Sequence, residues 1–128
     1  MTNQPVVAPG SAPPTGPFSP AIVATGTQIL VLSGQVADTS DGKTVVDDAG
    51  DQARQCLANI DALLRAAGAT SSDVVRLTIF LTQIGDRAAV AKARTEYFGE
   101  HRPAATLVEV SALVAPEYKV EIEATAIF

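Results

Sequence analysis

Two carboxylates near the end of the chain are the residues with the clearest potential for chemistry. Glu121 and Glu123 alternate with apolar residues over positions 119–128, so both point to one face of a predicted strand. Burying a carboxylate costs free energy unless the group is solvated, paired or used. A glutamate in an apolar cleft is suited to act as a general base on water. This face of the last strand is therefore our starting point for function.

The elements that must position this strand are predicted from periodicity. Residues 105–110 alternate as a strand, with Ala105, Leu107 and Glu109 on one face, and residues 74–82 form another. Apolar spacing predicts helices over 47–67, ending at Gly68, and over 87–98, with Asp86 as the N-cap. Residues 21–24 and 28–36 are predicted to pair as a hairpin, with a bulge at Gly34.

The resulting order, β-β-α-β-α-β-β, is typical of an α+β fold with one mixed sheet and two helices on one face. Two helices cannot cover both faces of such a sheet. The second face must find an apolar partner, and another copy of the chain is the simplest one. The sequence therefore predicts an oligomer.

Length and composition limit the class of protein. The 128 residues suffice for one domain, and we divide them into a flexible Pro-rich leader (1–15) and a single domain (16–128). A net charge of −5 disfavours nucleic acid and membrane surfaces as partners. With one His and one Cys, the chain has no His/Cys metal site, and Cys56 is interpreted as a packing residue. We expect a cytoplasmic protein.

An ordered set of motifs supports a more specific interpretation: GPFSPAI (16–22), SGQ (33–35), DQARQCLANIDALLRAAGA (51–69), VVRLTIFL (74–81), EYFGEHRPA (96–104), LVEV (107–110) and VEIEATA (120–126). The set resembles the Rid (reactive intermediate deaminase, YjgF-like) family. The resemblance implies a chorismate-mutase-like fold and a homotrimer whose sheets form a central barrel, with a cleft between each pair of subunits. It also implies hydrolysis of 2-imino or 2-enamino acids to 2-keto acids and ammonia, without a metal or cofactor.

The resemblance also assigns site residues. Glu121 matches the glutamate that orients the attacking water, and Ser33 and Gly34 match the substrate-binding SGQ turn. The other candidates for substrate binding are Phe18, where the family has Tyr; Ala105, where it has a carboxylate-binding Arg; Thr106; and Leu107, where it has Cys. An Asn common on the second helix is replaced by Ala91.

The missing Arg predicts an apolar pocket without a guanidinium, because a guanidinium–carboxylate contact is a strong orienting interaction. Such a pocket favours neutral or bulkier imines and enamines over small 2-imino acid anions, with Glu121 activating water. The alternative is a non-catalytic family member that binds a metabolite or a protein. Nuclease activity, claimed for some family members, is disfavoured by the acidic composition.

Overall fold

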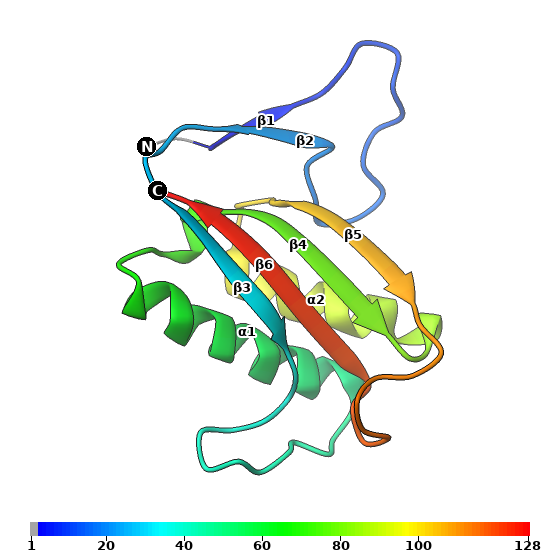
Figure 1. The fold of residues 1–128 in the computed structure, drawn as a ribbon. Helices are drawn as coiled ribbons and strands as arrows, with labels where there is room; N and C mark the ends of the chain where they lie inside the picture. Colours follow the sequence, from blue (N-terminus) through cyan, green and yellow to red (C-terminus); the bar gives the residue numbers. More distant parts are fainter. Residues whose placement is uncertain (1–2) are drawn as a thin grey trace.

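Two helices pack side by side on one face of a mixed four-stranded sheet (Figure 1). The computed structural model describes residues 3–128. Its elements are β1 (Asn3–Val6), β2 (Ala21–Ala24), β3 (Ile29–Gln35), α1 (Ala49–Ala66), β4 (Val74–Leu81), α2 (Arg87–Phe98), β5 (Ala104–Glu109) and β6 (Val120–Ile127), with short 3₁₀ turns at Ser71–Asp73 and Ile84–Asp86. The predicted α+β class, with both helices on one face, is confirmed.

The sheet has the order β3-β6-β4-β5, so the last strand of the chain lies inside it. β4 and β5 are parallel and are joined by α2, whereas β6 is antiparallel to both of its neighbours. Along β6, Val120, Ile122, Ala124 and Ala126 are buried against the helices. The glutamates of β6 therefore point to the opposite face, as the alternation predicts.

The core lies between the sheet and the apolar side of α1. Cys56, Leu57, Ile60 and Leu64 recur at helical spacing on this side and are fully or almost fully buried. Asp48 begins the helix by accepting a hydrogen bond from the Asp51 backbone nitrogen at 2.9 Å. Asp86 precedes α2, but its side chain caps no backbone group, because it adopts a helical backbone conformation at the end of the 3₁₀ turn. Asp86 thus occupies the N-cap position, as predicted, but without a capping hydrogen bond from its side chain.

Two amide side chains of α1 fix the loops that border β3 and β6. Buried Gln52 donates to the Glu117 carbonyl at 2.9 Å and accepts from the Lys119 backbone nitrogen at 2.8 Å, just before β6 begins. Asn59 donates to the carbonyls of Val36 and Asp38 at 3.1 and 2.9 Å, just after β3 ends. These bonds hold the start of β6 and the end of β3, which are the parts that carry Glu121 and Gly34.

The N-terminal strands are arranged differently from the prediction. β2 pairs with β1 in a separate two-stranded ribbon, not with β3, so the hairpin predicted for residues 21–36 is wrong (Figure 1). The chain between β2 and β3 instead bonds to the C-terminal residue, with Thr27 and Gln28 donating to the Phe128 carbonyl at 3.1 and 2.9 Å. Gly26 permits this approach, because a Cβ there would lie 2.8 Å from the Phe128 backbone nitrogen.

The ribbon involves part of the segment predicted to be a flexible leader. Residues 3–6 of that segment form β1, and residues 1–2 lie outside the described part of the chain. None of the helices within residues 3–128 has the length and apolar character needed to cross a membrane.

Candidate functional site

The first group of predicted site residues lies where β3 and β6 pair. The register between them shifts between Leu32 and Gln35, which confirms the bulge predicted at Gly34. The Glu121 carboxylate packs directly against Gly34, where a Cβ would overlap Oε2 and lie 2.8 Å from Cδ. Only glycine therefore leaves this carboxylate in place. We call Ser33, Gly34 and Glu121 the glutamate niche.

The Glu121 carboxylate is available for chemistry within this niche. The side chain is half-buried, and none of the described residues forms a hydrogen bond with it. On the adjacent strand β4, the residue paired with Glu121 is Phe80, which is also half-buried. A carboxylate in this position keeps its accepting oxygens for water or a ligand.

The second group of predicted residues lines a cavity of about 490 Å³ on the helix side of the sheet. The wall combines α2, β5 and the turn that carries Phe18, and it contains Thr15, Gly16, Pro17, Phe18, Ile84, Arg87, Ala88, Ala91, Arg94, Ala105 and Leu107. Ser19 fixes the turn to β5: its buried side chain donates to the Arg102 carbonyl, and its backbone nitrogen donates to the Pro103 carbonyl at 3.1 Å. We call this space the α2–β5 cavity.

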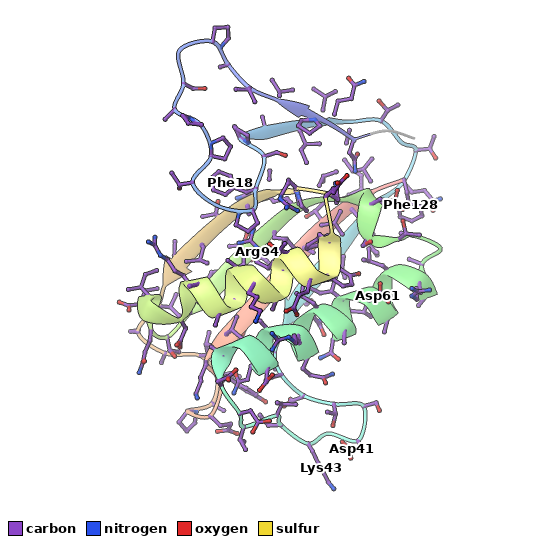
Figure 2. All side chains as sticks on the ribbon, turned by 180° about the vertical axis from the view of Figure 1, so that it is seen from behind. Phe18, Asp41, Lys43, Asp61, Arg94 and Phe128 are labelled. Atoms are coloured by element: carbon purple, nitrogen blue, oxygen red, sulfur yellow. The ribbon has the colours of Figure 1, made fainter. Side chains whose placement is uncertain are left out.

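Arg94 is the buried charged residue of this cavity's helix wall. Its exposed fraction is only 4%, and it lies between α2 and the turn with Phe18 (Figure 2). Nη2 donates to the Pro17 carbonyl at 3.3 Å, and the buried Nε has no partner among the described residues. Burial, with a smaller contribution from the charge of Arg102, lowers the pKa of Arg94 to about 10, so it remains charged at neutral pH. The cavity lined by Phe18, Ala105 and Leu107 therefore contains a guanidinium, which α2 supplies and position 105 does not.

The two groups lie on opposite faces of the sheet. Glu121 pairs with Phe80, and Phe80 pairs with Val108, so these three side chains share the face away from the helices. Leu107 pairs with buried Ile79 and faces the helices, as does Ala105. Thr106 is exposed on the Glu121 face and does not join the cavity. One chain thus places Glu121 against Gly34, which follows Ser33 in the sequence, and separately brings together Phe18, Ala105 and Leu107.

The sequence did contain a signal for Arg94 that the motifs did not use. Arg94 lies four residues after Val90 and four before Phe98, and both of these are buried on the inner side of α2. A charge on the apolar side of a predicted helix is unusual, because charged residues are almost never fully buried unless they are paired.

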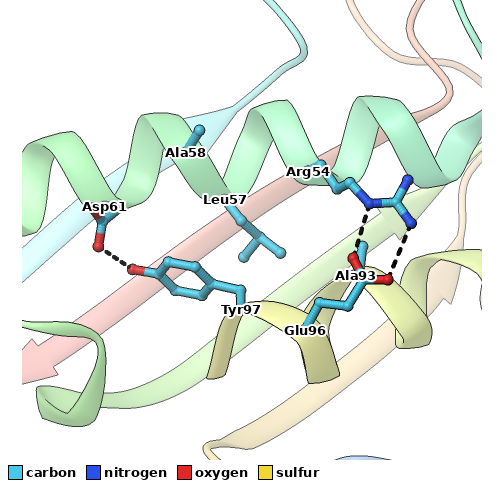
Figure 3. A pocket seen from close by; sticks show the side chains of 7 residues that line it. All are labelled: Arg54, Leu57, Ala58, Asp61, Ala93, Glu96 and Tyr97. Atoms are coloured by element: carbon cyan, nitrogen blue, oxygen red, sulfur yellow. Dashed lines mark hydrogen bonds and ion pairs between the residues drawn. The ribbon is translucent and has the colours of Figure 1, made fainter. Parts of the chain in front are cut away.

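A second hollow, on the outside of the two helices, is lined by side chains that form ion pairs and hydrogen bonds with one another (Figure 3). Arg54 pairs with Glu96 at 2.9 Å, and the Tyr97 hydroxyl donates to Asp61 at 2.6 Å. Burial and the bond to Asp61 raise the pKa of Tyr97. The same bond, with that from Arg65, lowers the pKa of Asp61. These contacts join α1 to α2.

Cys56 is not available as a nucleophile or metal ligand. It is fully buried, and burial, with the nearby charge of Glu121, raises the pKa of the thiol to about 12. Its interpretation as a packing residue is confirmed. Across residues 3–128 the structure contains no cluster of three or more His, Cys, Asp or Glu side chains that would hold a metal ion.

Comparison with known proteins identifies the family to which this α+β fold belongs. The solved structure of YyfB from Yersinia pestis, a Rid family protein of unknown function, has a TM-score of 0.90 and 34% identity, covering 100% of both chains. A RutC family protein of Pyrococcus horikoshii is 43% identical over 114 residues, which is 88% of each chain. Human 2-iminobutanoate/2-iminopropanoate deaminase is 35% identical over 113 residues, covering 88% of this chain and 80% of that one.

The model of the family described as Endoribonuclease L-PSP matches residues 9–128. The chain therefore belongs to this family, the YjgF/Rid family, and the resemblance found in its motifs is confirmed.

Proposed function

We propose that the protein is a deaminase-type hydrolase that acts on an imine or enamine in a cleft between two copies of the chain, with Glu121 activating water. The observation that carries this proposal is the glutamate niche. The niche holds a half-buried carboxylate against a glycine, with no hydrogen-bond partner among the described residues. Human and other relatives named 2-iminobutanoate/2-iminopropanoate deaminase make imine hydrolysis the reaction to test.

The need for a second copy follows from the two sheet faces. Glu121 and the α2–β5 cavity cannot meet on one chain, because the sheet lies between them. The face with Glu121 also exposes large apolar side chains, with exposed fractions of 69% at Ile29 and 75% at Val31. Covering them with another copy would remove apolar surface from water, and we propose that the same assembly brings the niche of one copy to the cavity of the next. A homotrimer is the assembly we propose.

The chemistry requires one proton acceptor and one water molecule. Water attacks the carbon of the protonated imine, and the Glu121 carboxylate takes a proton from it as the carbon–oxygen bond forms, which gives a neutral carbinolamine. Glu121 then returns this proton to the nitrogen, the carbon–nitrogen bond breaks to release ammonia, and the hydroxyl proton passes to the freed carboxylate as the carbonyl group forms. The products are a carbonyl compound and ammonia, and the net reaction consumes one water. An enamine enters the same sequence after protonation at carbon gives the imine.

Replacing Glu121 by Gln tests the proposed role of this residue. We expect Glu121→Gln to lower turnover by about 10²- to 10⁴-fold, the usual contribution of a general base. The assay measures loss of imines produced by an L-amino acid oxidase, relative to their spontaneous hydrolysis without the protein. Glu123→Gln is the matched control, because Glu123 is exposed two residues further along the same face.

Both variants should keep the wild-type mass by light scattering. Turnover by Glu121→Gln equal to that of the wild type, in an assembly of the same size, would remove the general-base role.

A non-catalytic, metabolite-binding protein is the second candidate. The separation of Glu121 from the cavity within each chain favours it, because the cavity alone is suited to bind a small molecule. Ligand binding to the wild type, without acceleration of imine hydrolysis for any substrate tested, would support this function instead.

A further inference from the structure

We propose that Arg94 binds the carboxylate of a ligand whose apolar body lies in the α2–β5 cavity. This inference deepens the proposed function, on which it rests for the reaction, by naming the residue of this chain that determines specificity. It differs from the prediction of a neutral substrate, which followed from the absence of an arginine at position 105.

The first argument is the cost of the Arg94 charge. With 4% exposure, this guanidinium has lost most of its contact with water. Its one hydrogen bond to protein within residues 3–128 is the long contact with the Pro17 carbonyl, and Nε has none. A buried, unpaired charge is strongly unfavourable, and native structures normally pair such groups. The missing partner of Arg94 is therefore expected to be an anion that binds in the cavity.

The other arginines show that this state is unusual for the chain. Arg54 and Arg65 each form an ion pair with a carboxylate. Arg102 donates to the backbone carbonyls of Gly99 and His101. Arg76 and Arg87 are exposed, so water solvates them. Among the described residues, Arg94 alone combines burial of the whole residue with an unpaired guanidinium nitrogen.

The second argument is the charge of the cavity wall. Besides Arg94 it includes Arg87, and it includes no Asp or Glu. Arg102 is close enough for its charge to contribute to the lowered pKa of Arg94. Three positive charges therefore gather at one place in a chain whose net charge is −5. Such a concentration favours an anionic ligand over a neutral or cationic one.

The third argument is the shape and polarity of the remaining wall. Phe18, Ala91, Ala105 and Leu107 supply apolar surface, and the volume of about 490 Å³ is within the range of small-molecule sites. A carboxylate is planar and accepts two parallel hydrogen bonds from a guanidinium, which orients the rest of the molecule. A small carboxylate with an aliphatic chain satisfies both the charge and the apolar wall.

The probe for this inference is 4-methyl-2-oxopentanoate, a stable 2-oxo acid with a branched apolar chain, and its neutral amide is the matched ligand. Binding is measured by isothermal titration calorimetry, which needs no turnover. We expect the wild type to bind the acid at least about 10-fold more tightly than the amide, because only the acid supplies a charged acceptor.

Arg94→Met keeps the length of the side chain and removes its charge. We expect this variant to bind the acid about 10- to 100-fold more weakly than the wild type, with the amide unchanged. It should fold, because an apolar side chain of similar volume suits the buried position. Arg65→Met is the control for net charge: Arg65 is exposed on α1, outside the cavity wall, and its replacement should change acid binding less than twofold.

Three results would overturn the inference: equal binding of acid and amide by the wild type, equal acid binding by wild type and Arg94→Met, or no acid binding by the wild type at millimolar concentration. Failure of the proposed function is distinguishable. If acid binding depends on Arg94 but the wild type hydrolyses no imine, the binding role stands and the catalytic proposal fails. If imines are hydrolysed with the same KM after Arg94→Met, the reaction stands and the role of Arg94 fails.

Discussion

The glutamate niche and the α2–β5 cavity place opposite charges in contrasting ways. Glu121 is half-buried on the open face of the sheet, held in place by the absence of a side chain at Gly34. Arg94 is almost fully buried on the helix face, beneath the turn with Phe18. Neither charge has a counter-ion among the described residues. Both regions are therefore incomplete in one chain, but for different reasons.

Under the proposed function, this contrast means that activity has two separate requirements, assembly of the chains and binding of a ligand. In our proposal another copy of the chain covers the niche, whereas the cavity is walled by a single chain and binds an anion. Assembly and ligand binding should therefore be separable by mutation. Three further variants test this, in order of decreasing expected effect.

The largest effect is expected from disrupting the open sheet face. Val31→Lys places a charge at a side chain that is 75% exposed in one chain and that we expect to be covered in the assembly. We predict smaller assemblies by light scattering and loss of essentially all imine hydrolysis, because niche and cavity no longer meet. Val114→Lys is the control, since Val114 is 86% exposed in the loop before β6. An active, single-chain form of Val31→Lys would refute the divided site.

Gly34→Ala should affect the niche and spare the cavity. The added methyl group displaces the Glu121 carboxylate, which is the flexible end of a side chain, so we expect the fold to persist and turnover to fall about 10- to 100-fold. Binding of 4-methyl-2-oxopentanoate should stay within about twofold of the wild type. The control is Gly85→Ala, where a Cβ would meet nothing within 4 Å. Full activity in Gly34→Ala would show that the carboxylate position does not matter.

The smallest effect is expected away from both regions. Tyr97→Phe removes the hydrogen bond to Asp61, and we predict a loss of about 1 kcal/mol in unfolding free energy at pH 7, with turnover unchanged. The bond holds the pKa of Asp61 below its usual value of 3.8, so its contribution is present above that pH and is lost as the pH falls through the lowered pKa.

Urea unfolding of wild type and Tyr97→Phe between pH 3 and pH 7 measures this dependence. The difference in stability between the two proteins should shrink toward pH 3. A difference that grows toward low pH would contradict the role given to Asp61.

The sequence by itself determined the local elements and the faces of the central strands. Helical spacing located α1 and α2 to within two residues or better, because burial of one side of a helix requires apolar residues at regular intervals. Alternation likewise predicted that Glu121 and Ile122 lie on opposite faces of β6. The motifs determined the family, and a glycine within a strand pattern predicted the bulge at Gly34.

Only the tertiary structure decided which distant segments meet. The pairing of β2 with β1 instead of β3 is a choice between partners that local periodicity does not distinguish. The register of β4, β5 and β6 placed Glu121 and Leu107 on opposite faces of the sheet. Arg94 became a candidate for ligand binding only when packing buried it beside Phe18, since a charge on a helix has no functional meaning until its surroundings are known.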